Sequence, residues 1–247
     1  MSALLEVREV TKRYGGVIAN NNVSLAVQEG QIVGLIGPNG SGKTTLFNSI
    51  VGTHPIDGGS IRFDGREISH LRVADIARLG LIRTFQQTRI FRQMSCLENM
   101  IVSVPQGDAS LRAMIAPPDA DDRAQAAELL AFVGLASKRD LPAGSLSFGQ
   151  QKLLEFAMAL MNRPRMLLLD EPTAGINPTL INGLVDRLKR ARDQLGITLF
   201  VIEHNMRVVM NLAEHVYCLA HGELLADGAP AALQQDPRVL AAYLGDR

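Results

Sequence analysis

The sequence of 247 residues has no net charge, almost no cysteine and no long apolar run. Lysine and arginine together number 25, and so do aspartate and glutamate. The single-sign field that draws proteins to nucleic acid is therefore absent, and we expect no nucleic-acid partner. No apolar run approaches the length of a membrane span, so any contact with a membrane must come through a partner protein.

The cysteines exclude a metal cluster or disulfide scaffold, and the first residues exclude a signal peptide. Cys96 and Cys218 are the only cysteines and stand far apart, which excludes a metal cluster or a disulfide scaffold and predicts ordinary buried thiols. Residues 4–10 alternate apolar and charged side chains, unlike a signal peptide, so we expect a cytosolic protein. The length suits one large domain or two closely associated subdomains.

A glycine-rich stretch, residues 37–45, organises the chain. It reads Gly-Pro-Asn-Gly-Ser-Gly-Lys-Thr-Thr and fits the spacing G-x-x-x-x-G-K-[ST]. An apolar run at 31–36 predicts a buried strand before it, and residues 46–51 can continue as a helix after it. Glycines let backbone N–H groups turn toward phosphate oxygens, and a helix N-terminus adds partial positive charge. The alternative is a glycine-rich turn without function, but the flanking strand and helix favour a nucleotide site.

The stretch contains the predicted ligands of a nucleotide and its metal ion. Lys43 would reach the β- and γ-phosphates of the nucleotide, and the Thr44 hydroxyl would ligate Mg²⁺. The residues predicted to bind nucleotide here are Gly37, Asn39, Gly40, Ser41, Gly42, Lys43, Thr44 and Thr45.

Two later apolar runs predict buried strands that end in polar side chains. Residues 166–169 precede Asp170 and Glu171, and residues 197–202 precede Glu203 and His204. The carboxyl ends of parallel strands form the ligand-binding edge of a sheet. Asp170 can hold Mg²⁺ through water, and Glu171 can orient an attacking water. A chance pair of acids is the alternative, and a lone histidine is usually structural, but the strand-end positions favour functional side chains.

Strand and helix patterns lie on both sides of a helical segment. Strands are expected at 5–10, 23–27, 60–63 and 80–85, turns at 15–16, 57–59 and 64–65, helices at 73–79, 121–133, 147–161 and 178–195, a hairpin at 216–226 and a helical tail at 231–244. Residues 86–144 therefore predict a mainly helical insertion, with a capping box at Ser95 and Glu98, between two parts of an α/β core at 1–85 and 145–247.

Two residues leave a structural and a functional interpretation open. Tyr14 is either a plain strand residue, which the residues alone favour, or a flat face on which a nucleotide base stacks. Ser147 predicts a helix N-cap, and a capped helix start is also an anion site, so both interpretations share one geometry.

The parts together resemble the ATP-binding subunit of an ABC transporter over essentially the whole chain. The resemblance depends on an order: the phosphate loop, Gln86, the segment 146–151, the strand ending at Glu171, and His204. It implies a P-loop NTPase core with an antiparallel β subdomain and an inserted α-helical subdomain.

The resemblance also implies roles for single residues. Tyr14 matches the aromatic residue that stacks on adenine. Gln86 matches the glutamine that senses Mg²⁺ and the attacking water, in the loop that faces the membrane subunits. The signature, residues 146–151, contributes Ser147, Gly149 and Gln150 to the γ-phosphate of ATP on the other protomer. Asp170 and Glu171 match the Mg²⁺-associated aspartate and the catalytic glutamate, and His204 matches the switch histidine.

The chain departs from the usual family pattern at two positions, and several of its segments resemble one group of relatives more closely. Phe148 replaces the first glycine of the usual signature pair, and Asn177 stands where aspartate is common. The segments 83–86, 174–178, 201–206, 226–228 and 236–245 resemble ATPases of branched-chain amino-acid uptake systems, to which urea and amide importers are close relatives.

The resemblance implies a sandwich dimer, with itself or a paralogue, that closes on two ATP and Mg²⁺ and drives membrane permease subunits. It would lie on the inner face of the cell membrane and serve a substrate-binding protein indirectly. Two alternatives are a soluble ABC ATPase acting on DNA or ribosomes and a non-hydrolysing nucleotide-binding regulator. The neutral charge disfavours the first, and the presence of both Glu171 and His204 disfavours the second.

Overall fold

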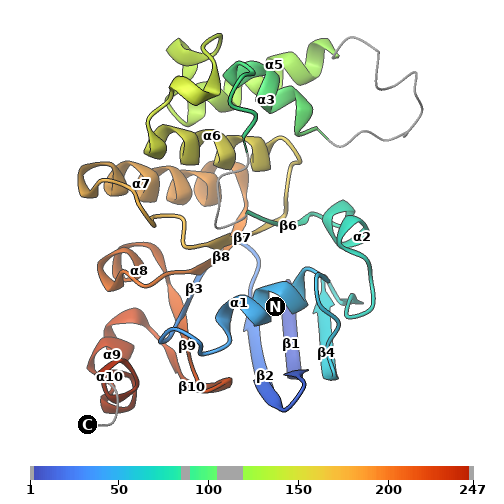
Figure 1. Cartoon of the computed structure of the whole chain (residues 1–247), viewed down its shortest axis with the longest axis vertical. Helices are drawn as coiled ribbons and strands as arrows, with labels where there is room; N and C mark the ends of the chain where they lie inside the picture. Colours follow the sequence, from blue (N-terminus) through green and yellow to red (C-terminus); the bar gives the residue numbers. More distant parts are fainter. Residues whose placement is uncertain (1–2, 85–89, 105–118, 245–247) are drawn as a thin grey trace. The chain divides into compact units, whose positions relative to one another are not determined.

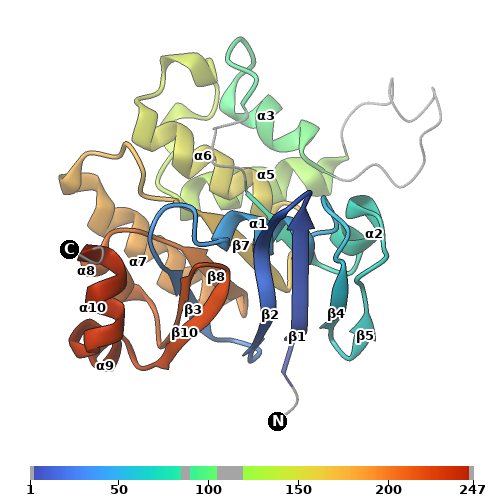
Figure 2. The same cartoon turned by 60° about the horizontal axis from the view of Figure 1, so that its bottom comes forward.

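The computed structural model describes residues 3–84, 90–104 and 119–244 (Figures 1 and 2). Its strands are β1 (Leu5–Tyr14), β2 (Val17–Val27), β3 (Ile32–Ile36), β4 (Gly58–Phe63), β5 (Arg66–Glu67), β6 (Leu81–Arg83), β7 (Met166–Asp170), β8 (Thr198–Ile202), β9 (His215–Ala220) and β10 (Glu223–Gly228). Its α-helices are α1 (Lys43–Ile50), α2 (Val73–Arg78), α3 (Cys96–Val102), α5 (Ala120–Phe132), α6 (Phe148–Leu160), α7 (Pro178–Leu195), α8 (Met206–Leu212), α9 (Pro230–Gln235) and α10 (Pro237–Leu244).

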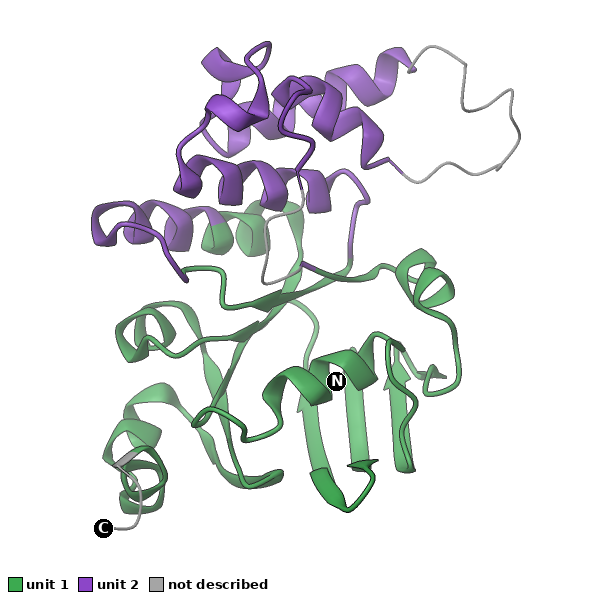
Figure 3. Ribbon diagram, viewed as in Figure 1, with its two compact units in different colours: residues 1–83, 165–173, 188–247 green, residues 84–164, 174–187 purple. Residues whose placement is uncertain are grey.

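The described residues divide into two compact units (Figure 3). Unit 1 comprises residues 1–83, 165–173 and 188–247, and unit 2 comprises 84–164 and 174–187. Helix α7 is divided between them.

The larger sheet of unit 1 is mostly parallel and has the order β10-β9-β3-β8-β7-β6. Only the β9–β10 hairpin is antiparallel. Strands β3, β7 and β8 are buried along their whole lengths, as expected for apolar runs in the middle of a parallel sheet. Because β3 lies next to β8, and β8 next to β7, the three strand ends that carry the predicted polar residues are adjacent.

The smaller sheet is antiparallel, with the order β2-β1-β4-β5, and it corrects two predictions. The strands predicted at 5–10 and 23–27 extend to Tyr14 and begin at Val17, because bulges in the β1–β2 pairing absorb the breaks in alternation. The turn predicted at 57–59 is wrong for its last two residues, which begin β4. A Cβ at Gly59 would lie 2.4 Å from the carbonyl oxygen of Arg8, so glycine permits the close approach of β1.

One hydrophobic core joins α1 to both sheets of unit 1. Phe47 of α1 is fully buried, and its ring lies 4.9 Å from that of Phe200 in β8. The same cluster contains Leu5 and Val7 of β1. Helix α1 is therefore fixed on both sides, and this fixes the loop that precedes it.

Unit 2 is helical over the residues that the structure describes. Helices α3, α5 and α6 pack on one another around buried Met100, Leu130 and Leu154. Ser95 and Glu98 form the predicted capping box at the start of α3.

The prediction of ordinary buried thiols is confirmed. Cys96 and Cys218 are buried free thiols, and burial raises the pKa of Cys218 to about 11. Among the described residues, we find no helix with the length and apolar character needed to cross a membrane.

Candidate functional site: a nucleotide cavity around the glycine-rich loop

Residues 37–42 join β3 to α1, so the predicted strand, loop and helix are present. Gly40 and Gly42 have φ angles of 78° and 98°, which side-chain-bearing residues rarely adopt. A Cβ at Gly42 would lie 2.3 Å from the carbonyl oxygen of Ala19. Glycine is therefore required where the loop passes β2.

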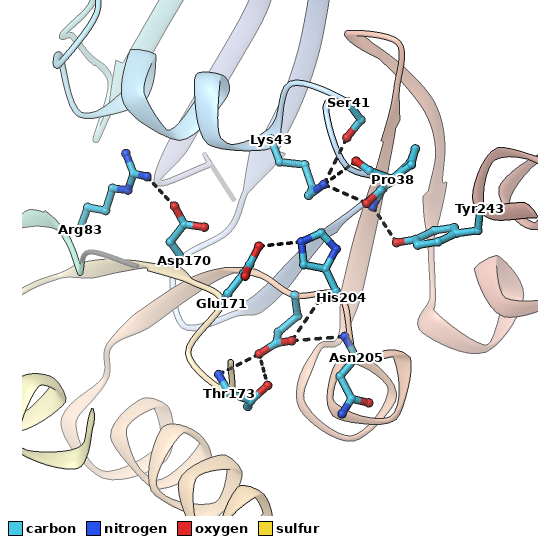
Figure 4. Close-up of polar contacts among 12 residues, drawn as sticks. Pro38, Ser41, Lys43, Arg83, Asp170, Glu171, Thr173, His204, Asn205 and Tyr243 are labelled. Atoms are coloured by element: carbon cyan, nitrogen blue, oxygen red, sulfur yellow. Dashed lines mark hydrogen bonds and ion pairs between the residues drawn. The ribbon is translucent and has the colours of Figure 1, made fainter. Parts of the chain in front are cut away.

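Lys43 is the first residue of α1, and its side chain points toward the loop (Figure 4). Its Nζ donates to the carbonyl oxygens of Gly37 at 2.8 Å and Pro38 at 2.9 Å, and to Ser41 Oγ at 3.3 Å. Burial lowers the pKa of Lys43, and the negative charges of Glu171 and Asp170 oppose that shift. The positive charge is therefore held close to the cavity by loop oxygens.

A cavity of about 480 Å³ opens over the loop, and its lining belongs entirely to unit 1. Residues 39–45, from the loop and the first turn of α1, line it together with Glu171 and His204. Residues 17–19 and the turn at 221–222 complete the wall. The structure thus brings predicted loop residues together with Glu171 and His204 around one space, whereas Asp170 does not line it.

Glu171 and His204 meet at this cavity because their strands are neighbours. Asp170 of β7 pairs with Ile202 of β8, so the residues just beyond each strand end are adjacent. His204 Nε2 lies 2.6 Å from Glu171 Oε1 (Figure 4). Glu171 has a φ of 49°, an uncommon conformation for a residue with a side chain.

Asp170 has a basic partner that the sequence did not reveal. Its carboxylate accepts from Arg83 of β6 at 2.5 Å, and the side chains are 2% and 9% exposed. Arg83 also donates to Asn48 of α1. Asp170 and Glu171 therefore each have a hydrogen-bonding partner of their own.

Glu203 is a second residue that sequence reasoning did not identify as part of the site. Its side chain is buried and accepts from Thr173 N at 3.0 Å, Thr173 Oγ1 at 2.5 Å, His204 N at 3.1 Å and Asn205 N at 3.3 Å. The carboxylate therefore ties the segment after Glu171 to the segment that carries His204. Its place just before a strand-end histidine was the available signal.

The residues present fit a nucleotide triphosphate and one divalent cation. The cavity is lined by a glycine loop at a helix N-terminus, which suits phosphate. Mg²⁺ usually takes one or two protein oxygens together with phosphate oxygens. The hydroxyl of Thr44 and the carboxylate of Asp170 offer that set, and no group of three or more metal-ligating acids, histidines or cysteines occurs in the described ranges.

The remaining predicted residues lie elsewhere. Tyr14 is 45% exposed at the end of β1 and pairs with Val17, which lines the cavity, but Tyr14 itself does not line it. Gly37 lies at the entry to the loop, outside the lining. Gln86 falls outside the described residues.

The signature belongs to unit 2, at the start of α6. Ser147 is the N-cap and forms a reciprocal capping box with Gln150. A Cβ at Gly149 would meet Leu180 of α7 at 3.1 Å. The capped helix start predicted at Ser147 is thus confirmed, and its anion-binding role stays a prediction.

The structure gives a physical account of Phe148, the departure from the usual signature. A Cβ at Gly175, whose φ is 74°, would lie 2.9 Å from Phe148 Cε1. The ring therefore packs directly on the glycine of the segment 174–178, which holds the start of α6 beside that segment.

The sequence of the chain is similar to those of known proteins over nearly its whole length. Residues 20–174 match the family described as ABC transporter, and residues 223–247 match the family described as branched-chain amino acid ATP-binding cassette transporter. The chain is 41% identical over 250 residues to the high-affinity branched-chain amino acid transport ATP-binding protein BraF of Pseudomonas aeruginosa, with 98% of each chain covered. It is 37% identical to the corresponding protein LivG of Escherichia coli, with the same coverage.

Two solved structures extend the comparison. An ATP-binding cassette of an ABC transporter in its ADP conformation has a TM-score of 0.90 and 32% identity, with 100% of both chains covered. A dimeric cassette in a post-hydrolysis state, bound to ADP and Pi, has a TM-score of 0.76 and 26% identity, with 92% of this chain and 98% of that chain covered.

Proposed function

The chain belongs to the ATP-binding subunits of ABC transporters, and from this membership we propose that it hydrolyses ATP to power uptake of branched-chain or other apolar amino acids. The observation that carries the substrate assignment is the segment 223–247. It matches a description particular to branched-chain amino-acid cassettes, whereas residues 20–174 match ABC transporters in general. The relatives BraF and LivG are described as branched-chain amino-acid transport proteins.

In the proposed reaction the loop positions ATP and Glu171 positions the water. Backbone N–H groups of the loop would surround the β- and γ-phosphates, and Lys43 would move from the loop carbonyls to the phosphate oxygens. Glu171 would orient the water for in-line attack on the γ-phosphate, and His204, 2.6 Å from it, would hold that carboxylate and contact the γ-phosphate. Tyr14 would stack on adenine.

Thr44 and Asp170 would hold Mg²⁺, with Gln86 in support. When bound, the ion supplies charge neutralisation at the β- and γ-phosphates. Asp170 would either bind Mg²⁺ while it keeps its ion pair with Arg83, or give up that ion pair when it binds the metal.

We infer that the working form is a dimer coupled to a membrane permease. Ser147, Gly149 and Gln150 would close on ATP held by the phosphate loop of a second subunit, either identical or a paralogue. Opening and closing would act on permease subunits through the region that contains Gln86, and a substrate-binding protein would deliver the amino acid to the permease. The chain would then lie on the inner face of the cell membrane.

Uptake measurements test the transported substrate. Deleting the gene should abolish high-affinity uptake of radiolabelled leucine, and the parent gene should restore it, whereas the Glu171→Gln gene should not. Urea and a short amide serve as comparison substrates. Unchanged leucine uptake with lost urea uptake would overturn the amino-acid assignment and favour the urea and amide importers.

A further inference from the structure

The C-terminal helix contacts the phosphate loop through one hydroxyl group. Gly37 N, in the peptide that enters the loop, donates to Tyr243 Oη at 2.8 Å (Figure 4). Tyr243 belongs to α10, 206 residues further along the chain. It also lies in the segment 223–247, which matches the branched-chain amino acid ATP-binding cassette transporter family.

Helix α10 is anchored beside the strand that leads into the loop. Val239 of α10 is 3% exposed and shares a hydrophobic cluster with Ile36, the last residue of β3. Asp236, just before α10, accepts from the backbone N–H of Arg238 at 2.8 Å and fixes the start of the helix. α10 also packs on α9 and β10, as Figures 1 and 2 show. The packing of Val239 therefore holds α10, which carries the 39% exposed Tyr243, beside the end of β3.

The loop side of this contact has little freedom. Gly37 has a φ of 146°, and a Cβ there would lie 2.0 Å from the carbonyl oxygen of Leu219 in β9. The carbonyl of Gly37 accepts from Lys43 Nζ at 2.8 Å. Gly37 thus connects α10, through its N–H group, to Lys43 in the cavity wall, through its carbonyl oxygen.

We propose that Tyr243 is a positioning residue for nucleotide binding, because its hydroxyl braces the entry of the phosphate loop from helix α10. The inference rests on the proposed binding of ATP and assigns a role to the C-terminal segment. Gly37 does not line the cavity, so its N–H bond to Tyr243 does not compete with phosphate. The brace acts by holding the loop in shape before the nucleotide arrives, and pre-organisation of this kind raises affinity.

The tyrosine hydroxyl itself, rather than the ring, carries this role. Burial raises the pKa of Tyr243, and its hydrogen bond with Gly37 opposes that shift. The hydroxyl is thus a neutral partner for an N–H group at neutral pH. A phenylalanine at this position would keep the packing of the ring and leave the Gly37 N–H without its partner.

Tyr243→Phe in the full-length chain tests the brace. A single net hydrogen bond corresponds to roughly threefold to tenfold in an equilibrium constant, and we expect Mg-ATP and Mg-ADP to bind more weakly by about that factor. Isothermal titration calorimetry measures both affinities. Hydrogen exchange adds the reciprocal readout: nucleotide should slow exchange of the α10 amides in the parent and not in Tyr243→Phe.

Tyr217→Phe is the matched control. The Tyr217 hydroxyl donates to the carbonyl oxygen of Ala26 at 2.8 Å, so this change also removes a tyrosine hydroxyl bound to backbone in unit 1, and Tyr217 does not line the cavity. Urea unfolding of both variants measures their stability. Tyr217→Phe should lose stability and keep the parental nucleotide affinity.

The outcomes separate this inference from the proposed function. Weaker nucleotide binding in Tyr243→Phe alone, with α10 protection lost, supports the brace. Parental affinity in Tyr243→Phe, or an equal loss in both variants, overturns it and leaves ATP binding by the parent intact. Failure of the parent to bind Mg-ATP overturns the proposed function and the brace together.

Discussion

Glu171 combines a strained backbone with a tightly held side chain. Its φ of 49° is a conformation that costs a residue with a side chain on the order of 1–3 kcal/mol. Its N–H donates to the carbonyl oxygen of Ile202 at 2.9 Å, which keeps the residue in place. The strained peptide aims the carboxylate into the cavity, where His204 meets it. Strain retained at such a point suggests a role in the chemical step.

Glu171→Gln keeps the shape of the side chain and removes its negative charge. We expect ATP binding to survive, because Lys43, Thr44 and Asp170 are unchanged. Steady-state phosphate release should fall by roughly a hundredfold or more, about 3 kcal/mol in barrier, as expected when a positioned base is lost. Asp170→Asn is the comparison, and it should weaken Mg²⁺-dependent nucleotide binding itself. Turnover of Glu171→Gln within about twofold of the parent, under about 0.5 kcal/mol, would make His204 the leading candidate.

Arg83 forms a buried ion pair with Asp170, one of the predicted metal ligands, and the two side chains are 9% and 2% exposed. Removing one partner of such a pair leaves an uncompensated charge and costs roughly 3–5 kcal/mol. Arg83→Met should therefore lower the free energy of unfolding by about that amount. The double variant Arg83→Met/Asp170→Asn should lose less than the sum of the two single changes. Urea unfolding of the parent, both single variants and the double variant, without Mg²⁺ or nucleotide, completes the double-mutant cycle. If the changes in unfolding free energy add within about 0.5 kcal/mol, the two residues are not coupled.

At the scale of elements, local pattern predicted the strand ends and could not predict their partners. Residues 166–169 and 199–202 are apolar throughout and are followed by charged residues, so the sequence indicated buried strands and polar ends. The contact of Asp170 with Arg83 depends on β6 lying next to β7, and strand order is not a local property. The extension of β1 to Tyr14 was missed for the opposite reason, because bulges interrupt the local alternation that the prediction used.

The Glu203 carboxylate connects the ends of β7 and β8, and its charge suits four donor groups. Glu203→Gln would replace one acceptor oxygen with an amide NH₂ that faces other donors. We expect a loss of roughly 1–3 kcal/mol in the free energy of unfolding, with slower ATP turnover because His204 is less well positioned. Thr173→Val is the milder control, since it removes only the hydroxyl partner and should cost about 1 kcal/mol. Parental stability and turnover in Glu203→Gln would show that the connection is dispensable.

At the scale of the whole molecule, the predicted site residues belong to different units. The cavity, with Lys43, Glu171 and His204, belongs to unit 1, and Ser147 with Gly149 belongs to unit 2. Ser147 begins a capped helix of 13 residues, a feature suited to a phosphate that the same subunit need not hold. A solved cassette similar to this chain is described as a dimer bound to ADP and Pi.

We therefore expect ATP to assemble the isolated chain into a dimer. In the Glu171→Gln background hydrolysis is blocked, so Mg-ATP should shift the chain from monomer to dimer in analytical ultracentrifugation, and Mg-ADP should not. Ser147→Arg places a bulky cation at the start of α6, where it should prevent closure. That variant should lose ATPase activity and dimer formation while it binds nucleotide as a monomer, because the cavity residues are unchanged. A chain that stays monomeric with ATP and hydrolyses it fully at high dilution would contradict the shared site.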